Sequence, residues 1–282
     1  MLEREAVAQR EYPFSEDTFQ RVRRMVHAEL GISLADSKRE LVYRRLSRRL
    51  RALKLSDFET YLILIERRDP EELQNFCNAL TTNLTSFFRE PDHFQFLAER
   101  LLPAIEHRNA GTRRIRIWSA GCSSGEEAYS AAMVAVEALG HLRGWSIRIL
   151  ATDIDSNVLE QARRGIYNGE ALEKVDAARL VRWFHRIGRS RQYRICPEVQ
   201  QLIAFRRLNL IDHWPMAGPF DVILCRNVII YFDRQTQRNV IERMAQLQRP
   251  DDHLILGYSE SLLDVSTRYR LIGHSIHCRL SP

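Results

Sequence analysis

The sequence has no pair of cysteines spaced as C-x-x-C, although it contains five cysteines in all. These lie far apart along the chain, at Cys77, Cys122, Cys196, Cys225 and Cys278. Such scattered thiols favour neither a zinc site nor a disulfide framework, so we expect no bound metal. Unpaired cysteines are typical of proteins in a reducing compartment, and the expected location is the cytoplasm.

The sequence also lacks an apolar run long enough to cross a membrane. Its most apolar stretch, residues 222–232, is interrupted by Arg226 and Asn227. The N-terminal stretch is charged from Glu3 onward, unlike a signal peptide. No internal repeat or low-complexity segment is present. We therefore expect a protein that is not inserted into the membrane.

The 282 residues are 45% hydrophobic and 28% charged, which is typical of a globular protein with room for two domains. The net charge of +6 is unevenly distributed. Residues 38–54 contain eight Lys or Arg and one acid, and residues 182–207 contain seven Arg and one acid. The remaining chain is therefore net acidic. Two basic clusters favour contact with acidic surfaces of a partner, although a nucleic-acid-binding protein has similar clusters.

Residues 12–82 have the pattern of a helical bundle. Ser15 is placed to cap a helix from about Asp17 to Leu30, and Gly31 is placed to end it. Two further helices are predicted at 56–65 and 70–80. Before them, an amphipathic helix has an apolar stripe at Val42, Leu46, Leu50 and Leu53. Its opposite face carries five arginines, which form either a solvated surface or a partner-binding surface: Arg44, Arg45, Arg48, Arg49 and Arg51. We favour the second interpretation because few acids are nearby.

Residues 83–91, N-L-T-S-F-F-R-E-P, show no regular period and predict a turn that leads into a helix at 91–102. From the residues alone, this segment is a linker whose Phe87 and Phe88 pack in the core. A strand at Ile115–Trp118 then precedes a turn with Gly121 and Gly125, and an apolar helix follows from Glu126. Strand, glycine turn and helix form the first half of a nucleotide-binding unit.

The glycine turn matches neither of two phosphate-binding motifs. Ser123 occupies the second glycine position of G-x-G-x-x-G, and Glu126 follows Gly125 where a P-loop requires lysine. Acids at this helix N-terminus would repel phosphates and suit a ligand that carries an ammonium and a sulfonium. Alternatively, Glu126 and Glu127 only interact favourably with the helix dipole.

The remaining chain indicates a parallel sheet with strands at 147–152, 220–225 and 253–257, and a last strand at 272–280. Asp153 ends the first of these strands, where nucleotide-binding folds place a ribose-hydroxyl acceptor. Asp155 or Ser156 is placed to cap the next helix, and Asp233 a later one. Residues 183–206 look like an insertion, and we expect an antiparallel hairpin between strands at 191–195 and 199–205.

Five stretches together resemble the CheR family of chemotaxis receptor methyltransferases: N-L-T-S-F-F-R-E (83–90), W-S-A-G-C-S-S-G-E-E-A-Y-S (118–130), A-T-D-I-D (151–155), L-N-L (208–210) and F-D-V-I-L-C-R-N-V-I-I-Y-F-D (220–233). The last of these, with G-Y-S-E at 257–260, and the first are specific to the family. The resemblance covers nearly the whole chain. One departure is Ala128, where the family commonly has proline.

This resemblance implies an α/β fold of the class I methyltransferase type, a Rossmann-like sheet with an inserted small antiparallel β-subdomain, preceded by an all-α domain. The implied domains are 1–82, a linker and connecting helix at 83–110, and a catalytic domain at 111–282 with its insertion at about 183–206. The implied activity is methyl transfer from S-adenosylmethionine to glutamate side chains of chemoreceptors, with S-adenosylhomocysteine as the product. The expected enzyme is a monomer that binds no nucleic acid.

The resemblance also implies roles for individual residues. Arg89 and Tyr231 match the pair nearest the transferred methyl group. Together with Gly121 of the glycine turn, the residues expected to line the cofactor site are Asn83, Thr85, Arg89, Glu126, Asp153, Asn209, Leu210, Arg226 and Asn227. In the family, the β-subdomain can bind a short peptide at the receptor's C-terminal tail. Partner-binding residues are therefore expected in the insertion, at Arg189, Arg191 and Arg194, and on the basic helix, at Arg44, Arg45, Arg48 and Arg49. The insertion is somewhat shorter than is usual in the family.

Two other functions fit parts of the pattern. A non-catalytic adaptor would keep the fold and the cofactor without turnover, but Arg89, Tyr231 and the acids favour an enzyme. An amino-methylating nucleic-acid enzyme would carry [DNS]-P-P-[YFW] after the fourth strand, where this chain has Cys225-Arg226-Asn227-Val228. The second function is thus disfavoured.

Overall fold

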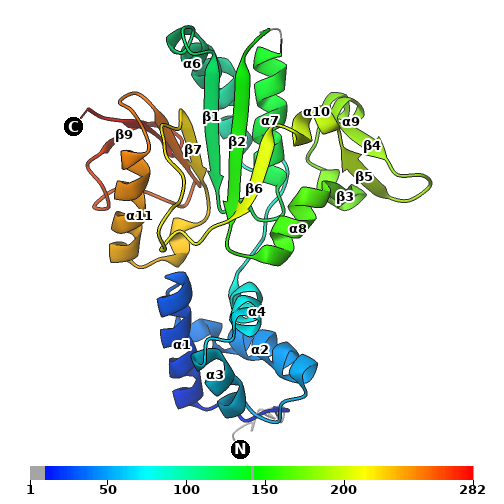
Figure 1. Cartoon of the computed structure of the whole chain (residues 1–282), viewed down its shortest axis with the longest axis vertical. Coiled ribbons are helices and arrows are strands. Elements are labelled where there is room, and N and C mark those ends of the chain that lie inside the picture. Colours follow the sequence, from blue (N-terminus) through cyan, green and yellow to red (C-terminus); the bar gives the residue numbers. More distant parts are fainter. Residues whose placement is uncertain (1–9, 141–142, 282) are drawn as a thin grey trace, which may run out of the picture. The chain divides into compact units, whose positions relative to one another are not determined.

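The computed structural model describes residues 10–140 and 143–281 (Figure 1). The chain forms two compact units that divide between Thr81 and Thr82. The N-terminal stretch on which the absence of a signal peptide was judged lies outside the described residues. Among the described residues, no helix is both long and apolar enough to cross a membrane.

The first unit is all-α, as predicted, with helices α1 (Glu16–Leu30), α2 (Arg39–Leu53), α3 (Phe58–Glu66) and α4 (Pro70–Leu80), and a short 3-10 turn, η1 (Asp36–Lys38). The predicted caps of α1 are confirmed, because the Ser15 side chain accepts the Thr18 N–H and Gly31 ends the helix in the left-handed conformation. Helix α3 begins at Phe58 rather than at residue 56, and Asp57 caps it.

The second unit is built on a seven-stranded sheet with the order β6-β2-β1-β7-β8-β10-β9. The strands are β1 (Arg114–Ala120), β2 (Ser146–Asp153), β6 (Ile203–Arg207), β7 (Val222–Cys225), β8 (His253–Leu256), β9 (Tyr269–Gly273) and β10 (Ile276–Arg279). Strands β6, β2, β1, β7 and β8 are parallel neighbours, and β10 runs antiparallel to β8 and β9. The mixed α/β fold is therefore confirmed.

Both faces of the central part of the sheet are buried, because alternate residues of strands β1, β7 and β8 belong to different cores. Ile117, Val222 and Ile255 belong to one core, while Trp118, Ile223 and Leu254 belong to the other. The first core includes helix α7 (Glu126–Leu139) and a continuous helical stretch made of α5 (Pro91–Phe96), a π-helical turn, η2 (Leu97–Leu101), and α6 (Leu102–Arg108). The second includes helix α11 (Arg234–Gln246), which Asp233 caps as predicted.

The expected hairpin between residues 191–195 and 199–205 is wrong. Strand β5 (Gln192–Ile195) is the centre of a separate antiparallel sheet, between β3 (Ile166–Asn168) and β4 (Phe184–Arg186). Pro197 starts a short helix, α10 (Pro197–Gln200), and the following residues form β6, which pairs in parallel with β2. The small antiparallel sheet exists, but its strands come from residues 166–195 rather than from the predicted 183–206. Helix α9 (Ala177–Trp183) lies in the sequence between β3 and β4.

The single last strand expected at 272–280 is also wrong, because β9 and β10 are two strands of a hairpin. The reversal occurs at His274 and Ser275, whose φ angles are 40° and 58°. Gly273 and Ser275 are residue types that are common in turns, so the sequence carries a turn signal that the prediction of a single strand did not use.

Candidate active site

The predicted cofactor residues follow four adjacent parallel strands at their carboxyl ends. Asn209 and Leu210 follow β6, Asp153 ends β2, the glycine turn follows β1, and Arg226 and Asn227 follow β7. Because parallel strands end at the same edge, these residues meet along one side of the sheet (Figure 1). This edge is the usual position of ligands in open α/β sheets.

The backbone of the glycine turn is fixed by bonds within the protein. The N–H groups of Gly121 and Cys122 both donate to the Thr152 carbonyl, at 2.8 and 2.9 Å, and the Ser123 N–H donates to Asp153 Oδ2 at 2.8 Å. Gly121 has a φ of 82°, and a Cβ atom there would lie 2.4 Å from Val228 Cγ2. The turn therefore requires glycine, and these three amides are not available to cradle a phosphate.

Asp153 combines burial with spare acceptor capacity. It is 9% exposed, and its two oxygens accept the backbone N–H groups of Ser123 and Asp155, at 2.8 and 3.0 Å. An ionised carboxylate has about four acceptor positions, and the Ile154 backbone also donates to Asp153, so the remaining capacity is available for ribose hydroxyls. Burial raises the pKa of Asp153 to about 6.

The two acids of helix α7 have different partners. Glu126 accepts a hydrogen bond from Ser124 Oγ, at 2.7 Å to its nearer oxygen, and Glu127 accepts one from Ser119 Oγ at 2.7 Å. Both side chains are buried, and burial raises both pKa values. A glutamate that only interacts with the helix dipole would lie in solvent. These acids instead form part of the interior next to the glycine turn.

The segment 83–90 packs against the glycine turn and the small sheet. Asn83 Nδ2 donates to Asp155 Oδ2 at 2.6 Å, and its carbonyl accepts Ser123 Oγ at 3.0 Å. The Phe87 ring lies 4.9 Å from the Tyr167 ring of β3 and 5.3 Å from the Phe184 ring of β4. The segment is thus held on both sides, with Thr85 half-buried within it.

Arg226 connects the segment 83–90 to the end of β7. Its guanidinium forms ion pairs with Glu90 at 3.0 Å and Glu127 at 3.2 Å, and it also donates to the Arg89 carbonyl. Only 2% of this side chain is exposed. Arg226 therefore links the backbone that carries Arg89 to the loop that carries Tyr231. This role differs from a direct cofactor contact by the guanidinium.

The proposed catalytic pair lies on two irregular segments. Arg89 is half-buried and donates through Nη1 to the Leu84 carbonyl at 3.0 Å. Tyr231 is half-buried at the end of a 3-10 turn, η4 (Ile229–Tyr231). On the opposite side of the edge, Asn209 Oδ1 accepts the Ile211 N–H at 3.3 Å.

One residue of this region, Glu260, was given no role by the sequence reasoning. It belongs to the G-Y-S-E stretch after β8, and its buried carboxylate accepts backbone N–H groups from the loop after β7. The available signal was a glycine directly after a buried strand with an acid three residues later. That pattern predicts a turn but does not indicate which backbone the acid binds.

The basic face of α2 differs from the expectation. Arg45 donates to the carbonyls of Leu80 and Thr81 at the end of α4, and Arg49 forms an ion pair with buried Glu72. The premise that these arginines lack acidic partners is therefore wrong, since the acid is distant in sequence. Arg44 and Arg48 are exposed and remain a predicted partner surface.

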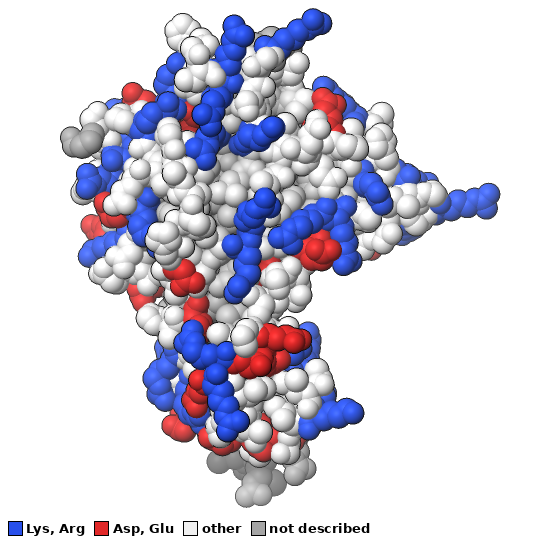
Figure 2. Space-filling model, in the orientation of Figure 1, with Lys and Arg blue, Asp and Glu red and all other residues white. Residues whose placement is uncertain are grey.

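The arginines of the small sheet face solvent. Arg189, Arg191 and Arg194 are all exposed, and the structure gives them no ion pair within its described ranges. Figure 2 shows blue side chains along the projection that carries β4 and β5 in Figure 1.

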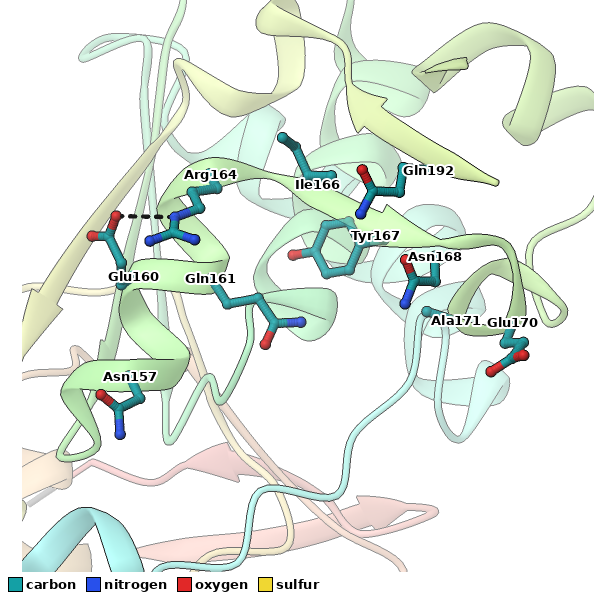
Figure 3. A pocket seen from close by; sticks show the side chains of 10 residues that line it. All are labelled: Asn157, Glu160, Gln161, Arg164, Ile166, Tyr167, Asn168, Glu170, Ala171 and Gln192. Atoms are coloured by element: carbon teal, nitrogen blue, oxygen red, sulfur yellow. Dashed lines mark hydrogen bonds and ion pairs between the residues drawn. The ribbon is translucent and has the colours of Figure 1, made fainter. Parts of the chain in front are cut away.

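A pocket of about 680 Å³ lies between helix α8 (Ser156–Arg164) and the small sheet (Figure 3). Amide and charged side chains dominate its lining, which comprises Asn157, Glu160, Gln161, Arg164, Ile166, Tyr167, Asn168, Glu170, Ala171 and Gln192. None of the predicted cofactor residues contributes to it. The pocket is therefore distinct from the carboxyl edge of the main sheet.

Comparisons with known proteins identify the family. Residues 83–278 match the CheR methyltransferase SAM binding domain, and residues 17–81 match the CheR methyltransferase all-alpha domain. The chain belongs to the CheR methyltransferase family. It is accordingly a methyltransferase that uses S-adenosylmethionine. The buried acids fit that cofactor, and so does a glycine turn whose amides are already bonded and do not bind a phosphate.

The curated relatives match along nearly their whole length. Chemotaxis protein methyltransferase 2 of Pseudomonas aeruginosa is 44% identical over 273 residues, which cover 95% of this chain and 94% of that protein. The chemotaxis protein methyltransferase of Escherichia coli is 41% identical over 268 residues, covering 93% and 91%. Among solved structures, cofactor-bound Rv0187 has a TM-score of 0.36 at 17% identity and covers 64% of this chain and 59% of its own.

Proposed function

We propose that the protein transfers a methyl group from S-adenosylmethionine to glutamate carboxylates of chemoreceptors. The observation that carries the proposal is the edge formed by Asp153, Glu126 and the internally bonded glycine turn, in a chain of the CheR family. Relatives named chemotaxis protein methyltransferase support chemoreceptors as the substrate class.

The cofactor supplies an electrophilic methyl group on a sulfonium. Asp153 is suited to accept both ribose hydroxyls, because two backbone donors already fix its carboxylate plane. Glu126 is suited to a cationic group of the ligand, since its acceptor positions are only partly used by Ser124. Asn209 and Leu210 follow β6, which pairs with β2, and would line the same site next to Asp153.

A substrate glutamate has an ordinary pKa near ~4.3 and is ionised at neutral pH, so the reaction requires no general base. Transfer is then an in-line displacement in which positioning supplies most of the rate. Arg89 and Tyr231 are proposed to orient the carboxylate. A firm ion pair to Arg89 would make the carboxylate a weaker nucleophile, so the proposed role of the pair is orientation.

We further propose that the β-subdomain binds the receptor's C-terminal tail. Strand β4 pairs only with β5 among the described residues, which leaves one edge for an added peptide strand. The exposed Arg189 and Arg191 lie between β4 and β5, and the exposed Arg194 lies on β5 opposite His185 of β4; these arginines would attract an acidic, carboxylate-terminated peptide. Such a tether would raise the local concentration of enzyme near its glutamates.

The function is tested by incubating the protein with radiolabelled S-adenosylmethionine and receptor-containing membranes. The label should appear on the receptor and be released as methanol by alkali, as expected for a carboxyl ester. A receptor whose acceptor glutamates are replaced by alanine is the matched control. Label that is stable to alkali, or that persists on the control receptor, would contradict the glutamate assignment.

A further inference from the structure

Two loops begin at the same edge of the main sheet, one after β7 and one after β8. The two strands are parallel, and their last residues, Cys225 and Leu256, are direct neighbours. The first loop continues through Asn227 to Tyr231. The second is the short turn Gly257–Glu260, which is closed by the Glu260 N–H donating to the Gly257 carbonyl at 2.9 Å.

The carboxylate of Glu260 binds the backbone of both loops. Oε2 accepts the N–H groups of Asn227 and Gly257, each at 2.7 Å. Oε1 accepts those of Val228 at 2.9 Å and Ile230 at 3.2 Å. A carboxylate has about four acceptor positions, so all of them are used. Glu260 is 5% exposed and forms no ion pair in the part of the chain that the structure describes.

Gly257 leaves the space that the Asn227 side chain occupies beside the turn after β8. A Cβ atom at this residue would lie 2.5 Å from Asn227 Nδ2 and 3.0 Å from Asn227 N. Asn227 itself has a φ of 59°, in the left-handed region that asparagine adopts more readily than most residues other than glycine. The glycine therefore provides room for the Asn227 side chain, and the glutamate holds the Asn227 backbone in this conformation.

The loop held in this way reaches both parts of the active site. The Val228 side chain lies against Gly121 of the glycine turn. The Ile230 N–H is within η4, the 3-10 turn that ends at Tyr231. A shift of the backbone of residues 227–230 would thus move both the glycine turn of the predicted cofactor site and the Tyr231 ring.

We propose that Glu260 is a positioning residue for the cofactor-site loop 226–231, acting through Asn227 on cofactor binding and through Tyr231 on methyl transfer. The second of these effects rests on the proposed function, whereas the first does not. The chemistry required of Glu260 is that of an anion with two acceptor oxygens, and its volume alone is insufficient.

Glu260→Gln tests this requirement because glutamine has nearly the same volume. One carboxylate oxygen becomes an NH₂ group, which would face two backbone N–H donors. We expect Glu260→Gln to weaken S-adenosylmethionine binding about tenfold or more in calorimetry, as much as Glu260→Ala does. If the Gln variant binds like the wild type while the Ala variant is weakened, Glu260 only fills space and the proposal is overturned.

Glu72→Gln is the matched control, because Glu72 is also a buried glutamate but belongs to the first unit. This variant should lose stability and keep its cofactor affinity. Hydrogen exchange of peptides covering 226–232 should quicken in Glu260→Gln and stay unchanged in Glu72→Gln. Unchanged exchange in a folded Glu260→Gln protein would overturn the proposal without reference to any activity.

A double-mutant cycle with Asn227→Ala separates positioning from general damage. If Glu260 acts through Asn227, adding Glu260→Gln to Asn227→Ala should weaken cofactor binding by no more than about threefold further. Fully additive losses would show that Glu260 acts elsewhere. Turnover is read separately: a receptor that is never methylated contradicts the proposed function, while the binding cycle still decides the role of Glu260.

Discussion

The two arginine-rich regions of the chain look alike in sequence and differ in structure. On α2, Arg49 is bound to buried Glu72 and Arg45 binds the end of α4. In the small sheet, Arg189, Arg191 and Arg194 are exposed without acidic partners among the described residues. A count of local charges therefore indicates where arginines gather, but only the fold decides which of them serve stability and which are free for a partner.

The largest effect is expected at the internal arginine. Arg49→Ala would leave the Glu72 carboxylate buried with only neutral donors, Tyr61 and Asn75, and should lower the free energy of unfolding of the first unit by about 3 kcal/mol. All four tryptophans, Trp118, Trp145, Trp183 and Trp214, lie in the second unit. In urea, far-UV circular dichroism should therefore shift to lower concentration while tryptophan fluorescence does not.

Arg48→Ala is the control for this experiment, since Arg48 is exposed on the same helix. We expect its unfolding curve to coincide with the wild type. Equal shifts for the two variants would mean that the Arg49–Glu72 pair contributes nothing beyond helix propensity.

Cofactor binding through the buried Asp153 should depend on pH rather than on salt, in contrast with partner binding through the two arginine surfaces. Asp153 has a pKa of about 6, so it becomes neutral as the pH falls through 6 and loses acceptor capacity for the ribose. We expect cofactor affinity to fall below pH 6, and cofactor binding at pH 6 to release about half a proton. Calorimetry in two buffers of different ionisation enthalpy measures that release, and Asp153→Asn should abolish it.

The stability of the cofactor-free protein should depend on pH in the opposite direction from cofactor affinity. Because the pKa of Asp153 is higher in the folded protein than its ordinary value of 3.8, the unfolded chain ionises first as pH rises. Stability of the cofactor-free protein therefore falls as the pH rises from about 4 to about 6, and the full loss due to Asp153 remains at higher pH. Asp153→Asn should flatten the dependence of the melting temperature on pH in that range. A parallel curve for the variant would assign the raised pKa to another group.

The exposed arginines of the small sheet should affect the binding of a receptor tail peptide and leave the folding of the protein unchanged. Reversing Arg189, Arg191 and Arg194 to glutamate should weaken a receptor tail peptide about tenfold or more at low salt, with a smaller loss at high salt. The control reverses three exposed charges of the first unit, Arg24, Lys54 and Arg67. If both triple variants lose affinity equally, only net charge matters and the edge of β4 is not the binding site.

The smallest effect is expected for Arg44 and Arg48. Their reversal to glutamate should slow receptor methylation about threefold at low salt, because exposed charges steer association, and the difference should vanish at high salt. Cofactor affinity and melting temperature should be unchanged. A wild-type rate at low salt would identify this face of α2 as a solvated surface only.

The parts of the site that sequence reasoning could find are those fixed by local pattern. Strand β1, the turn at Gly121 and helix α7 are contiguous, and Asp153 ends a buried strand. The parts that it missed depend on distant partners. The sequence predicts that residues 199–205 pair with the strand just before them, yet β6 pairs with β2, more than fifty residues earlier. Glu260 likewise binds a backbone thirty or more residues away.

The internally bonded glycine turn has a consequence for selectivity among adenosine compounds. In a cell, the abundant molecules with an adenosine moiety are mostly phosphorylated, and an adenosine site risks being occupied by them. Here the amides of Gly121, Cys122 and Ser123 are already engaged, and buried acids lie beside them. A phosphate would therefore find no donors in these amides and would lie beside acidic side chains, so we expect the backbone of the turn itself to disfavour phosphorylated nucleotides.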